Sequence, residues 1–321
     1  MNILITGGAG FLGSHLSDAL LARGDEVTIL DVIGDLKVRH HLGHPHFHYV
    51  RDSVFNTEIL DGLALRCDLV YHLAAVVGVE HYVADPYEVL NVNINGTQAV
   101  LKAAYKHNRK VVLASTSEVY GRNPRIPFAE DDDRVLGSTR LDRWCYATSK
   151  AAAEHFGFAY HRMGLPVVVL RYFNVYGPRL DRLDVGRVVT IFAGQVLRGK
   201  PVTVIGDGSQ TRCFTYVEDA IRATVAAGSE ERAVGQAINV GSDHEISLLE
   251  FAKTMIRLAA SSSPIVFVDQ EAVYGDRYED VPRRVPSLQR MHEILDVRAE
   301  ISLEEGLRRT IDWFRAGNGL A

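Results

Sequence analysis

The chain has 321 residues, of which 47% are hydrophobic and 23% charged, and its net charge is -5 at pH 7. This mixture is typical of a soluble globular protein, and the length allows one large domain or two lobes. A slightly acidic balance without a long basic block excludes the usual electrostatics of a nucleic-acid binder, so we expect a small-molecule ligand. Three widely spaced cysteines, Cys67, Cys145 and Cys213, indicate neither a disulfide framework nor a metal site.

The first residues after Met1 form a strand-like run without the charged and apolar regions of a signal peptide. No apolar run approaches the roughly 20 residues that cross a bilayer. We therefore expect no membrane partner and a cytoplasmic location.

Short apolar runs alternate with longer helix-like segments through the first half of the chain. The predicted strands cover residues 3–6, 26–30, 48–50, 69–73, 111–114 and 167–171. Such alternation is typical of βαβ units, and runs that are apolar at successive positions indicate strands buried on both faces. The sequence therefore predicts an α/β fold of the Rossmann type, with a doubly wound parallel sheet.

Glycines and prolines interrupt the pattern beyond about residue 175. We expect residues 1–175 to form a dinucleotide-binding domain and residues 176–321 to form mainly a smaller substrate-binding lobe. Some later segments are expected to return to the main sheet.

A glycine-rich turn follows the first predicted strand and opens a helix predicted over residues 11–22. Gly7 permits a tight turn, Gly10 lets the backbone approach a pyrophosphate, and Gly13 lets the helix pack on the strand. Phe11 and Leu12 begin the helix, whose N-terminal amides and dipole favour an anion. The pattern predicts a dinucleotide site.

Asp31 ends the second strand, where an acidic side chain meets the adenosine ribose and repels a 2'-phosphate. The cofactor is therefore predicted to be NAD rather than NADP. Further contacts are expected at the ends of the third and fourth strands, from Asp52, Ser53, Leu73, Ala74 and Ala75.

Tyr146 and Lys150 are four residues apart, so in a helix they share a face and can approach one ligand. A neighbouring ammonium stabilises a phenolate, which would let Tyr146 accept a proton from a sugar hydroxyl near neutral pH. Lys150 would also reach the nicotinamide ribose. Thr116 and Glu118 are expected to project to one side of the fifth strand because strand side chains alternate.

Six stretches together carry a resemblance to a known family: residues 7–13, 115–121, 146–150, 171–174, 186–189 and 206–212. Across essentially its whole length the chain resembles the extended short-chain dehydrogenases of the NAD-dependent epimerase/dehydratase family. Within that family it is most similar to UDP-glucuronate decarboxylases, namely the UDP-xylose synthases and the decarboxylase of the aminoarabinose pathway. The resemblance implies decarboxylation of UDP-glucuronic acid through a 4-keto intermediate, giving UDP-xylose, UDP-4-keto-pentose or both, in a homodimer.

The resemblance also implies roles for individual residues. Tyr146, Thr116 and Lys150 would act in the oxidation, while Ser117 and Glu118 would orient the sugar. The substrate would be contacted by Asn174 at the diphosphate, by Arg187 and Val188 in a lid region, by Arg212 at a phosphate, and by Arg284 at the sugar carboxylate, with Arg283 as the alternative to Arg284.

Three alternatives remain open. A 4,6-dehydratase usually has an Asp before the glutamate, where this chain has Ser117, a poor acid. A 4-epimerase does not need Glu118 but is not excluded by it. A non-catalytic NAD-sensing scaffold would be expected to have lost Tyr146 or Lys150. The loop near Glu80 and His81 departs from the decarboxylase pattern, and Glu80 fits beside a substrate carboxylate only if it faces away.

Overall fold

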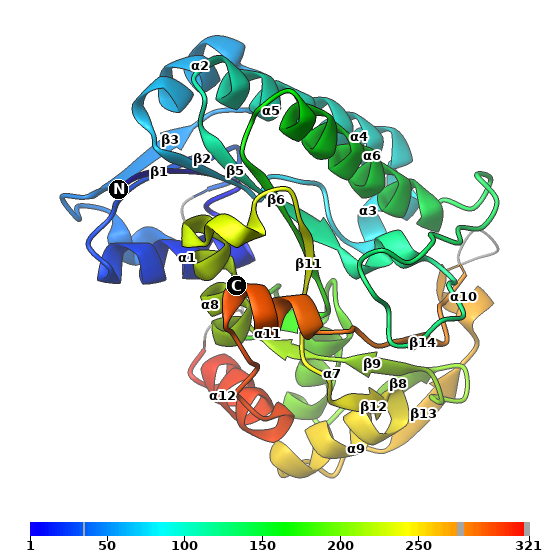
Figure 1. Cartoon of the computed structure of the whole chain (residues 1–321). Helices are drawn as coiled ribbons and strands as arrows, with labels where there is room; N and C mark the ends of the chain where they lie inside the picture. The colour runs from blue at the N-terminus through cyan, green and yellow to red at the C-terminus, as the bar shows by residue number, and fades with distance from the viewer. Residues whose placement is uncertain (35, 275–278, 318–321) are drawn as a thin grey trace.

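The centre of the fold is a parallel sheet with helices on both faces (Figure 1). The structure is a computed structural model that describes residues 1–34, 36–274 and 279–317. Within these residues seven strands form the sheet in the order β11-β6-β5-β4-β1-β2-β3. Their bounds are β1 (Asn2–Thr6), β2 (Glu26–Asp31), β3 (Phe47–Arg51), β4 (Leu69–His72), β5 (Lys110–Thr116), β6 (Val167–Tyr172) and β11 (Ala237–Val240).

The apolar runs of the sequence became strands because both faces of the sheet are buried. The six predicted strands all exist, and each ends within two residues of its predicted bounds. In β1, Ile3 and Ile5 pack into the hydrophobic core on one side of the sheet, whereas Leu4 packs into the core on the other. The predicted doubly wound α/β fold is confirmed.

Helices form a layer on each side of this sheet. The helix predicted over residues 11–22 is α1, with those bounds. In Figure 1, α2, α4, α5 and α6 lie above the sheet, and α1, α8 and α11 lie below it. The helices of the main domain are α1 (Phe11–Ala22), α2 (Thr57–Arg66), α3 (Val79–Ala84), α4 (Pro86–Leu90), α5 (Thr97–Lys106), α6 (Arg143–Arg162), α8 (Val217–Ser229) and α11 (Gln289–Leu295), with short turns η1 (Arg39–His41), the π-helical η2 (Asn91–Gly96), η3 (Ser117–Tyr120) and η4 (Glu231–Ala233).

The strand order reverses beside β1. Strand β2 pairs with one edge of β1 and β4 with the other, so the loops that leave β1 and β4 turn to opposite faces of the sheet. In open α/β sheets, ligands bind at the carboxyl ends of the strands at such a reversal. Strand order alone therefore places a ligand crevice beside the glycine-rich turn.

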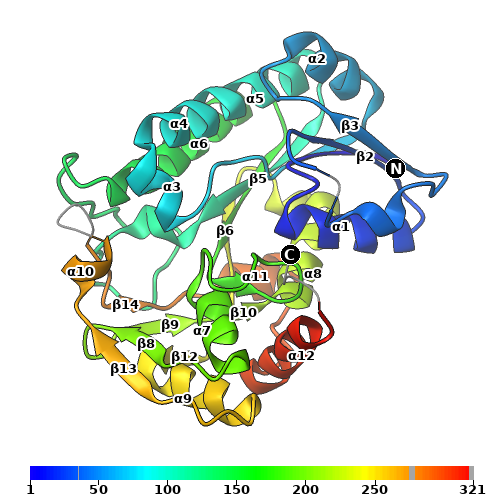
Figure 2. The same ribbon diagram turned by 180° about the vertical axis from the view of Figure 1, so that it is seen from behind.

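A second lobe is built from the later part of the chain and lies below the main sheet in Figure 2. It contains three small sheets and most of the remaining helices. Its elements are β7 (Val175–Tyr176) with β10 (Thr215–Tyr216), β8 (Val202–Ile205) with β13 (Ile265–Val268), β12 (Glu245–Ser247) with β9 (Thr211–Cys213) and β14 (Arg283–Arg284), and α7 (Val188–Leu197), α9 (Leu248–Leu258), α10 (Gln270–Tyr274) and α12 (Leu303–Arg315).

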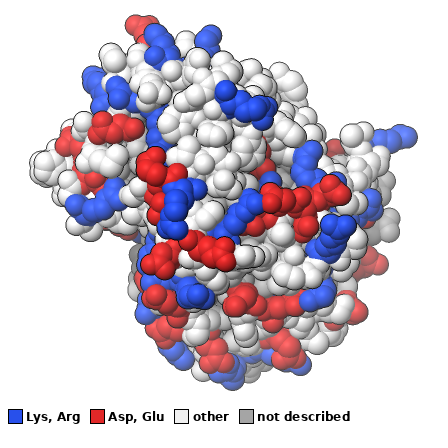
Figure 3. Space-filling model, viewed as in Figure 1, with Lys and Arg blue, Asp and Glu red and all other residues white. Residues whose placement is uncertain are grey.

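The chain crosses between the two parts more than once. Strand β11 pairs in parallel with β6 and so belongs to the main sheet, although it lies far beyond residue 175. Basic and acidic side chains are interspersed over the face seen in Figure 3.

One local prediction is wrong. Glu118 was expected to continue the strand that carries Thr116, but β5 ends at Thr116. The Thr116 hydroxyl accepts a hydrogen bond from the Glu118 backbone amide at 3.3 Å and caps the turn η3. A capping threonine satisfies an amide that the strand would otherwise pair, so the chain turns there. Glu118 therefore reaches the site from a 3-10 turn and not by strand alternation.

Candidate active site

The carboxyl ends of the central strands open into a large cavity between the sheet and the second lobe. Its volume is about 960 Å³, within the range of sites for small molecules. Apart from Arg283, the alternative to Arg284, the residues that the sequence suggested for a site all line this one cavity. They are Gly7, Gly10, Phe11, Leu12, Gly13, Asp31, Asp52, Ser53, Leu73, Ala74 and Ala75 on the expected cofactor side, and Thr116, Ser117, Glu118, Tyr146, Lys150, Asn174, Arg187, Val188, Arg212 and Arg284 on the expected substrate side.

The glycine-rich turn leaves no room for side chains. Gly7 has a φ of +75°, and a Cβ there would lie 2.5 Å from the amide nitrogen of Ala74. A Cβ on Gly13 would lie 2.4 Å from the Gly7 carbonyl oxygen. The turn leads into α1, whose N-terminus has no side-chain cap among the described residues. Backbone amides at a helix start of this kind bind a pyrophosphate, as a dinucleotide requires.

Two carboxylates line the cavity at the ends of β2 and β3. Asp31 accepts hydrogen bonds from the backbone amides of Ala9 at 2.9 Å and Ile33 at 3.1 Å, so it fixes the glycine-rich turn as well as the following loop. Burial raises its pKa, which those hydrogen bonds oppose. Asp52 accepts from the Ser53 amide at 2.7 Å. Both acceptors suit ribose and base hydroxyl or amine donors, and Asp31 disfavours a phosphate on the ribose.

Helix α6 presents a stripe of three polar side chains to the cavity. Arg143, Tyr146 and Lys150 lie at positions i, i+3 and i+7, which share one helical face. All three are buried. Lys150 donates to the carbonyl oxygen of Ala114 at 2.8 Å, and burial lowers its pKa to about 8. The Tyr–Lys pair was expected from sequence; Arg143 was missed, although the same spacing rule would have found it.

The titration of Tyr146 differs from expectation. Burial and the charge of Glu118 raise its pKa to about 12, while Arg187 and a hydrogen bond with Thr116 act in the opposite direction. The expectation that Lys150 brings this pKa near neutrality is therefore wrong for the chain by itself. The phenol needs added positive charge, or loss of the negative charge beside it, before it can act as a base at neutral pH.

Glu118 is held between two arginines. Its Oε1 accepts from Arg284 at 2.6 Å and its Oε2 from Arg143 at 3.0 Å. Burial alone would raise its pKa, but the charges of Arg143 and Arg284 outweigh burial and hold it at about 2. Glu118 is therefore a carboxylate at neutral pH, able to accept hydrogen bonds but not to give up a proton.

A second carboxylate extends this chain of charges. Asp280 accepts from Arg212 at 2.7 Å and lies 3.8 Å from the Arg143 guanidinium. The sequence suggested a phosphate partner for Arg212, and in the structure Asp280 occupies part of its fork. The group at this end of the cavity combines three guanidinium ions with two carboxylates and so carries one net positive charge. Its members are Arg143, Arg212, Arg284, Glu118 and Asp280.

The two adjacent arginines of β14 point to different sides. Arg284 is 7% exposed at its side chain and faces the cavity, whereas Arg283 is 53% exposed and pairs with Glu245 at 2.8 Å. Strand alternation explains the difference. Of the two candidates left by the sequence, Arg284 is the one that lies in the site.

The remaining expected substrate residues also line the cavity. Asn174 has a left-handed φ of 41° and donates to the Cys213 carbonyl at 2.8 Å. Arg187 precedes α7 and pairs with Asp181 at 2.9 Å, and Val188 begins that helix. Arg187 and Val188 come from the second lobe, whereas Asn174 lies between β6 of the main sheet and β7.

Part of the segment that follows β4 lines the cavity. His81 lines the cavity, but Glu80 does not and is 46% exposed at its side chain. This arrangement keeps the Glu80 charge away from the site.

Cys145 is half-buried, and burial raises its pKa to about 11, so it is a packing thiol. Asp131, in the acidic run, is exposed and pairs with Arg290.

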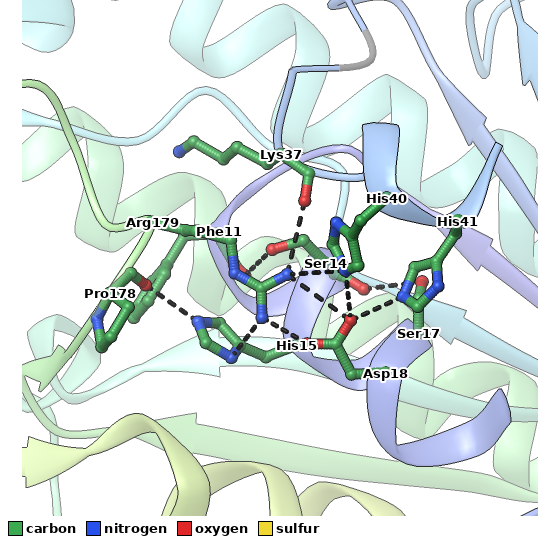
Figure 4. A network of polar contacts seen from close by, with 11 residues as sticks. Phe11, Ser14, His15, Ser17, Asp18, Lys37, His40, His41, Pro178 and Arg179 are labelled. Atoms are coloured by element: carbon green, nitrogen blue, oxygen red, sulfur yellow. Dashed lines mark hydrogen bonds and ion pairs between the residues drawn. The ribbon is translucent and has the colours of Figure 1, made fainter. Parts of the chain in front are cut away.

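A polar cluster that the sequence analysis missed lies next to the cofactor side (Figure 4). Asp18 on α1 pairs with His40 at 2.8 Å, with His41 at 2.6 Å and with Arg179. Hydrogen bonds from Arg179 and His40 outweigh burial and hold the Asp18 pKa at about 2. The Asp18 and histidine atoms are close enough to share a metal ion, but Arg179 already donates to Asp18 and would repel a cation there.

The cluster ties three segments together. Arg179 donates to Nδ1 of His15 at 2.7 Å, and Nε2 of His15 donates to the Pro178 carbonyl oxygen at 2.8 Å. Burial and Arg179 lower the His15 pKa to about 4, so the ring is neutral. Lys37 donates to the Leu180 carbonyl oxygen at 2.7 Å. Helix α1, the loop after β2 and the start of the second lobe are therefore fastened together.

Comparison with known proteins identifies the family. The model of the NAD-dependent epimerase/dehydratase family matches residues 3–241, which is most of the chain. The chain belongs to this family. A UDP-N-acetyl-alpha-D-glucosaminuronate decarboxylase of Bacillus cytotoxicus is 42% identical over 315 residues, 97% of both chains. UDP-glucuronic acid decarboxylase 1 of Xenopus tropicalis is 36% identical over 317 residues, 98% of this chain and 72% of the relative.

Other members of the epimerase/dehydratase family have the same fold. The UDP-glucuronic acid 4-epimerase of Bacillus cereus, solved with UDP-glucuronic acid and NAD, superposes with a TM-score of 0.87 at 33% identity, covering 98% of this chain and 99% of that one. The glycine-rich turn and Asp31 fit NAD, and this epimerase/dehydratase family member is an NAD-dependent enzyme. In the described part of the chain no helix combines the length and the apolarity that a membrane span needs.

Proposed function

We propose that this enzyme is an NAD-dependent decarboxylase of UDP-glucuronic acid. The observation that carries the proposal is the placement of Arg284, with Glu118 and Arg143, at the end of the cavity that also holds Tyr146 and Thr116. One net positive charge in that group of ionised side chains suits a substrate that brings a carboxylate. The two decarboxylase relatives support the same interpretation.

Bound NAD would supply a hydride acceptor at the sugar C4. Tyr146 would take the proton of the 4-hydroxyl, with Thr116 as its hydrogen-bond partner. The 4-ketone makes the carboxylate on C5 that of a β-keto acid, so carbon dioxide can leave with its electrons entering an enolate. The hydroxyl groups of Thr116 and Tyr146 would stabilise the enolate oxygen.

The remaining residues would position the substrate. Arg284 would bind the sugar carboxylate, and Ser117 and the ionised Glu118 would accept hydrogen bonds from the sugar. Lys150 would hold the nicotinamide ribose. Asn174 would contact the nucleotide diphosphate and Arg212 a phosphate, while Arg187 and Val188 would lie in the lid region over the substrate. Protonation of the enolate at C5 would give UDP-4-keto-pentose with NADH, and return of the hydride to C4 with a proton on its oxygen would give UDP-xylose and NAD, so the products would be either sugar or both.

UDP-N-acetylglucosaminuronate is a second candidate substrate. The relative with 42% identity is named for UDP-N-acetylglucosaminuronate, which differs from UDP-glucuronate at C2 but carries the same carboxylate on C5. The proposed chemistry at C4 and C5 is the same for both. Which of the two UDP-uronates is the substrate depends on the space that the cavity leaves around the sugar C2. Turnover of the two compounds, measured side by side, distinguishes them.

Epimerisation and dehydration share the first oxidation. A dehydratase needs an acid where this chain has Ser117, whose hydroxyl is too weak an acid for that role. A 4-epimerase retains the carboxylate, as the name of the Bacillus cereus structure indicates for that protein. A non-catalytic NAD-binding scaffold has no need of Tyr146 and Lys150 side by side in the cavity.

The test is incubation of purified protein with NAD and each of the two UDP-uronates, followed by NMR of the sugar products. We expect loss of the C6 carboxyl signal and appearance of pentose or 4-keto-pentose signals. An unchanged hexuronate, or its C4 epimer alone, would contradict decarboxylation. We further propose that the protein is cytoplasmic and forms a homodimer through α6 and a neighbouring helix. Size-exclusion chromatography with light scattering tests the dimer.

A further inference from the structure

Arg143 is a residue of the cavity that none of the proposed steps uses. It is the first residue of the 20-residue helix α6, its side chain is 2% exposed, and its guanidinium lies 5.5 Å from the centre of the Trp144 ring. Its position is therefore fixed by a long helix. Arg284, by contrast, belongs to the two-residue strand β14.

Glu118 is shared by these two arginines. Arg284 donates a hydrogen bond to Oε1, and Arg143 donates one to Oε2. A guanidinium that binds an incoming sugar carboxylate has to share or give up its existing carboxylate partner, since both compete for the same donors. If Arg284 moved to the substrate and Glu118 had no other cation, a buried carboxylate would be left unpaired, which is costly.

We propose that Arg143 is a positioning residue for the decarboxylation: it holds Glu118 in place and ionised while Arg284 changes partner from Glu118 to the sugar carboxylate. The inference rests on the proposed function. It explains why one carboxylate has two arginines before any substrate binds. It also explains the surplus positive charge, because the substrate carboxylate would neutralise it.

The charged and titratable groups around Glu118 come from four places. Helix α6 contributes Arg143 and Tyr146, while Arg284 comes from β14 and Arg212 from β9. Asp280, just before β14 in the chain, lies between Arg143 and Arg212. A charged Glu118 opposes ionisation of Tyr146, whereas the charges of Arg187 and Arg284 favour it.

The test compares Arg143→Met with Arg140→Met, a matched loss of one exposed arginine three residues earlier. We expect Arg143→Met to lower kcat roughly tenfold to hundredfold with a much smaller change in KM, and Arg140→Met to leave both unchanged. The pH profiles are more specific. The acidic limb of kcat, which reports the substrate complex, should move to higher pH more than the acidic limb of kcat/KM, which reports the free enzyme.

This difference follows from the partner exchange. In the free enzyme Arg284 still pairs with Glu118 in the variant, whereas in the substrate complex Glu118 has lost both cations. Arg143→Lys keeps the charge and should return the acidic limb of kcat to its wild-type position. A merely structural role of Arg143 would lower kcat without separating the two limbs.

A double-mutant cycle with Glu118→Gln keeps the test decisive if Arg143→Met is less stable than wild type. Arg143→Met should have no further effect on kcat in the Glu118→Gln background. Additive losses, equal movement of both limbs, or wild-type kinetics of Arg143→Met would each overturn the inference alone. A wild-type enzyme that releases no carbon dioxide from either UDP-uronate overturns the proposed function and the inference with it.

Discussion

The Arg284 guanidinium lies 2.6 Å from Oε1 of Glu118, although the two residues are 166 positions apart in the chain. The contact joins β14 of the second lobe to the turn that follows β5 of the main sheet. An acidic group and the cation proposed to bind the substrate therefore depend on how the two lobes meet.

Arg284→Met is expected to lower kcat/KM for UDP-glucuronate roughly tenfold to hundredfold, because it removes a charged hydrogen-bond donor from a buried site. Arg283→Met is the matched control, since Arg283 is the adjacent residue and pairs with Glu245 outside the cavity. Steady-state kinetics of the two variants check the prediction. Equal effects of the two substitutions would mean that Arg284 does not bind the substrate.

Tyr146→Phe is expected to lower turnover by about 10² to 10⁴, because it removes the proposed proton acceptor and leaves the ring packed against Tyr82. Single-turnover measurement of NADH absorbance with UDP-glucuronate tests the oxidation step directly. Tyr105→Phe, on the exposed side of α5, makes the same chemical change away from the cavity. Wild-type NADH formation in Tyr146→Phe would remove this tyrosine from the mechanism.

The acid stability of the protein should depend on Glu118. Despite burial, Arg143 and Arg284 hold its pKa at about 2, below the usual 4.5. A depressed carboxyl pKa contributes stability that is fully present above the unfolded pKa and is lost as the pH falls from about 4.5 towards 2. Glu118→Gln should therefore flatten the fall of Tm over this range in a thermal scan.

Glu250→Gln serves as the comparison for acid stability, because Glu250 is an exposed glutamate on α9. It should retain the wild-type slope of Tm against pH. If Glu118→Gln also retained that slope, the carboxylate would not be stabilised by its two arginines.

Local sequence patterns were sufficient for part of this site. The glycine-rich turn and the Tyr146–Lys150 pair depend on spacings of a few residues, so the sequence predicted them and the structure places them in one cavity. The prediction that Glu118 projects from the same strand as Thr116 was wrong, because Thr116 caps a turn and the alternation of strand side chains ends there. Capping threonines can often be recognised in a sequence. Thr116, however, is the last residue of a strand of high β-propensity, so its sequence context predicts a strand and not a cap.

Contacts between distant segments had no such pattern. Asp280 and Arg212 are 68 residues apart, and the Arg179 contact with Asp18 spans 161 residues. Nothing in the neighbourhood of either residue in sequence specifies its partner, because the pairing depends on how the second lobe is placed. Arg143 is the intermediate case: the sequence analysis missed it, and its helical spacing from Tyr146 could have predicted its direction but not its bond to Glu118.

Asp31→Asn is expected to reduce the preference for NAD over NADP. The carboxylate repels a 2'-phosphate, and an amide of the same shape does not. The amide side chain of the variant would keep one acceptor for the Ala9 or Ile33 backbone amide that Asp31 now binds. Affinities for both cofactors, from quenching of intrinsic fluorescence, check this. A preference ratio equal to that of wild type would show that another group selects the cofactor.

Arg179→Met is expected to weaken NAD binding several-fold and to lower Tm, because Arg179 joins α1 and the loop that follows Asp31 to the second lobe (Figure 4). Removing it leaves Asp18 with its two histidines and takes away the hydrogen bond to the Lys37 carbonyl oxygen, while the Lys37 ammonium keeps its own bond to Leu180. Isothermal titration with NAD and a thermal scan measure the two effects. Arg182→Met, an exposed arginine three residues later, should change neither. Unaltered affinity in Arg179→Met together with a lowered Tm would mean that the cluster supports the fold but not the cofactor loop.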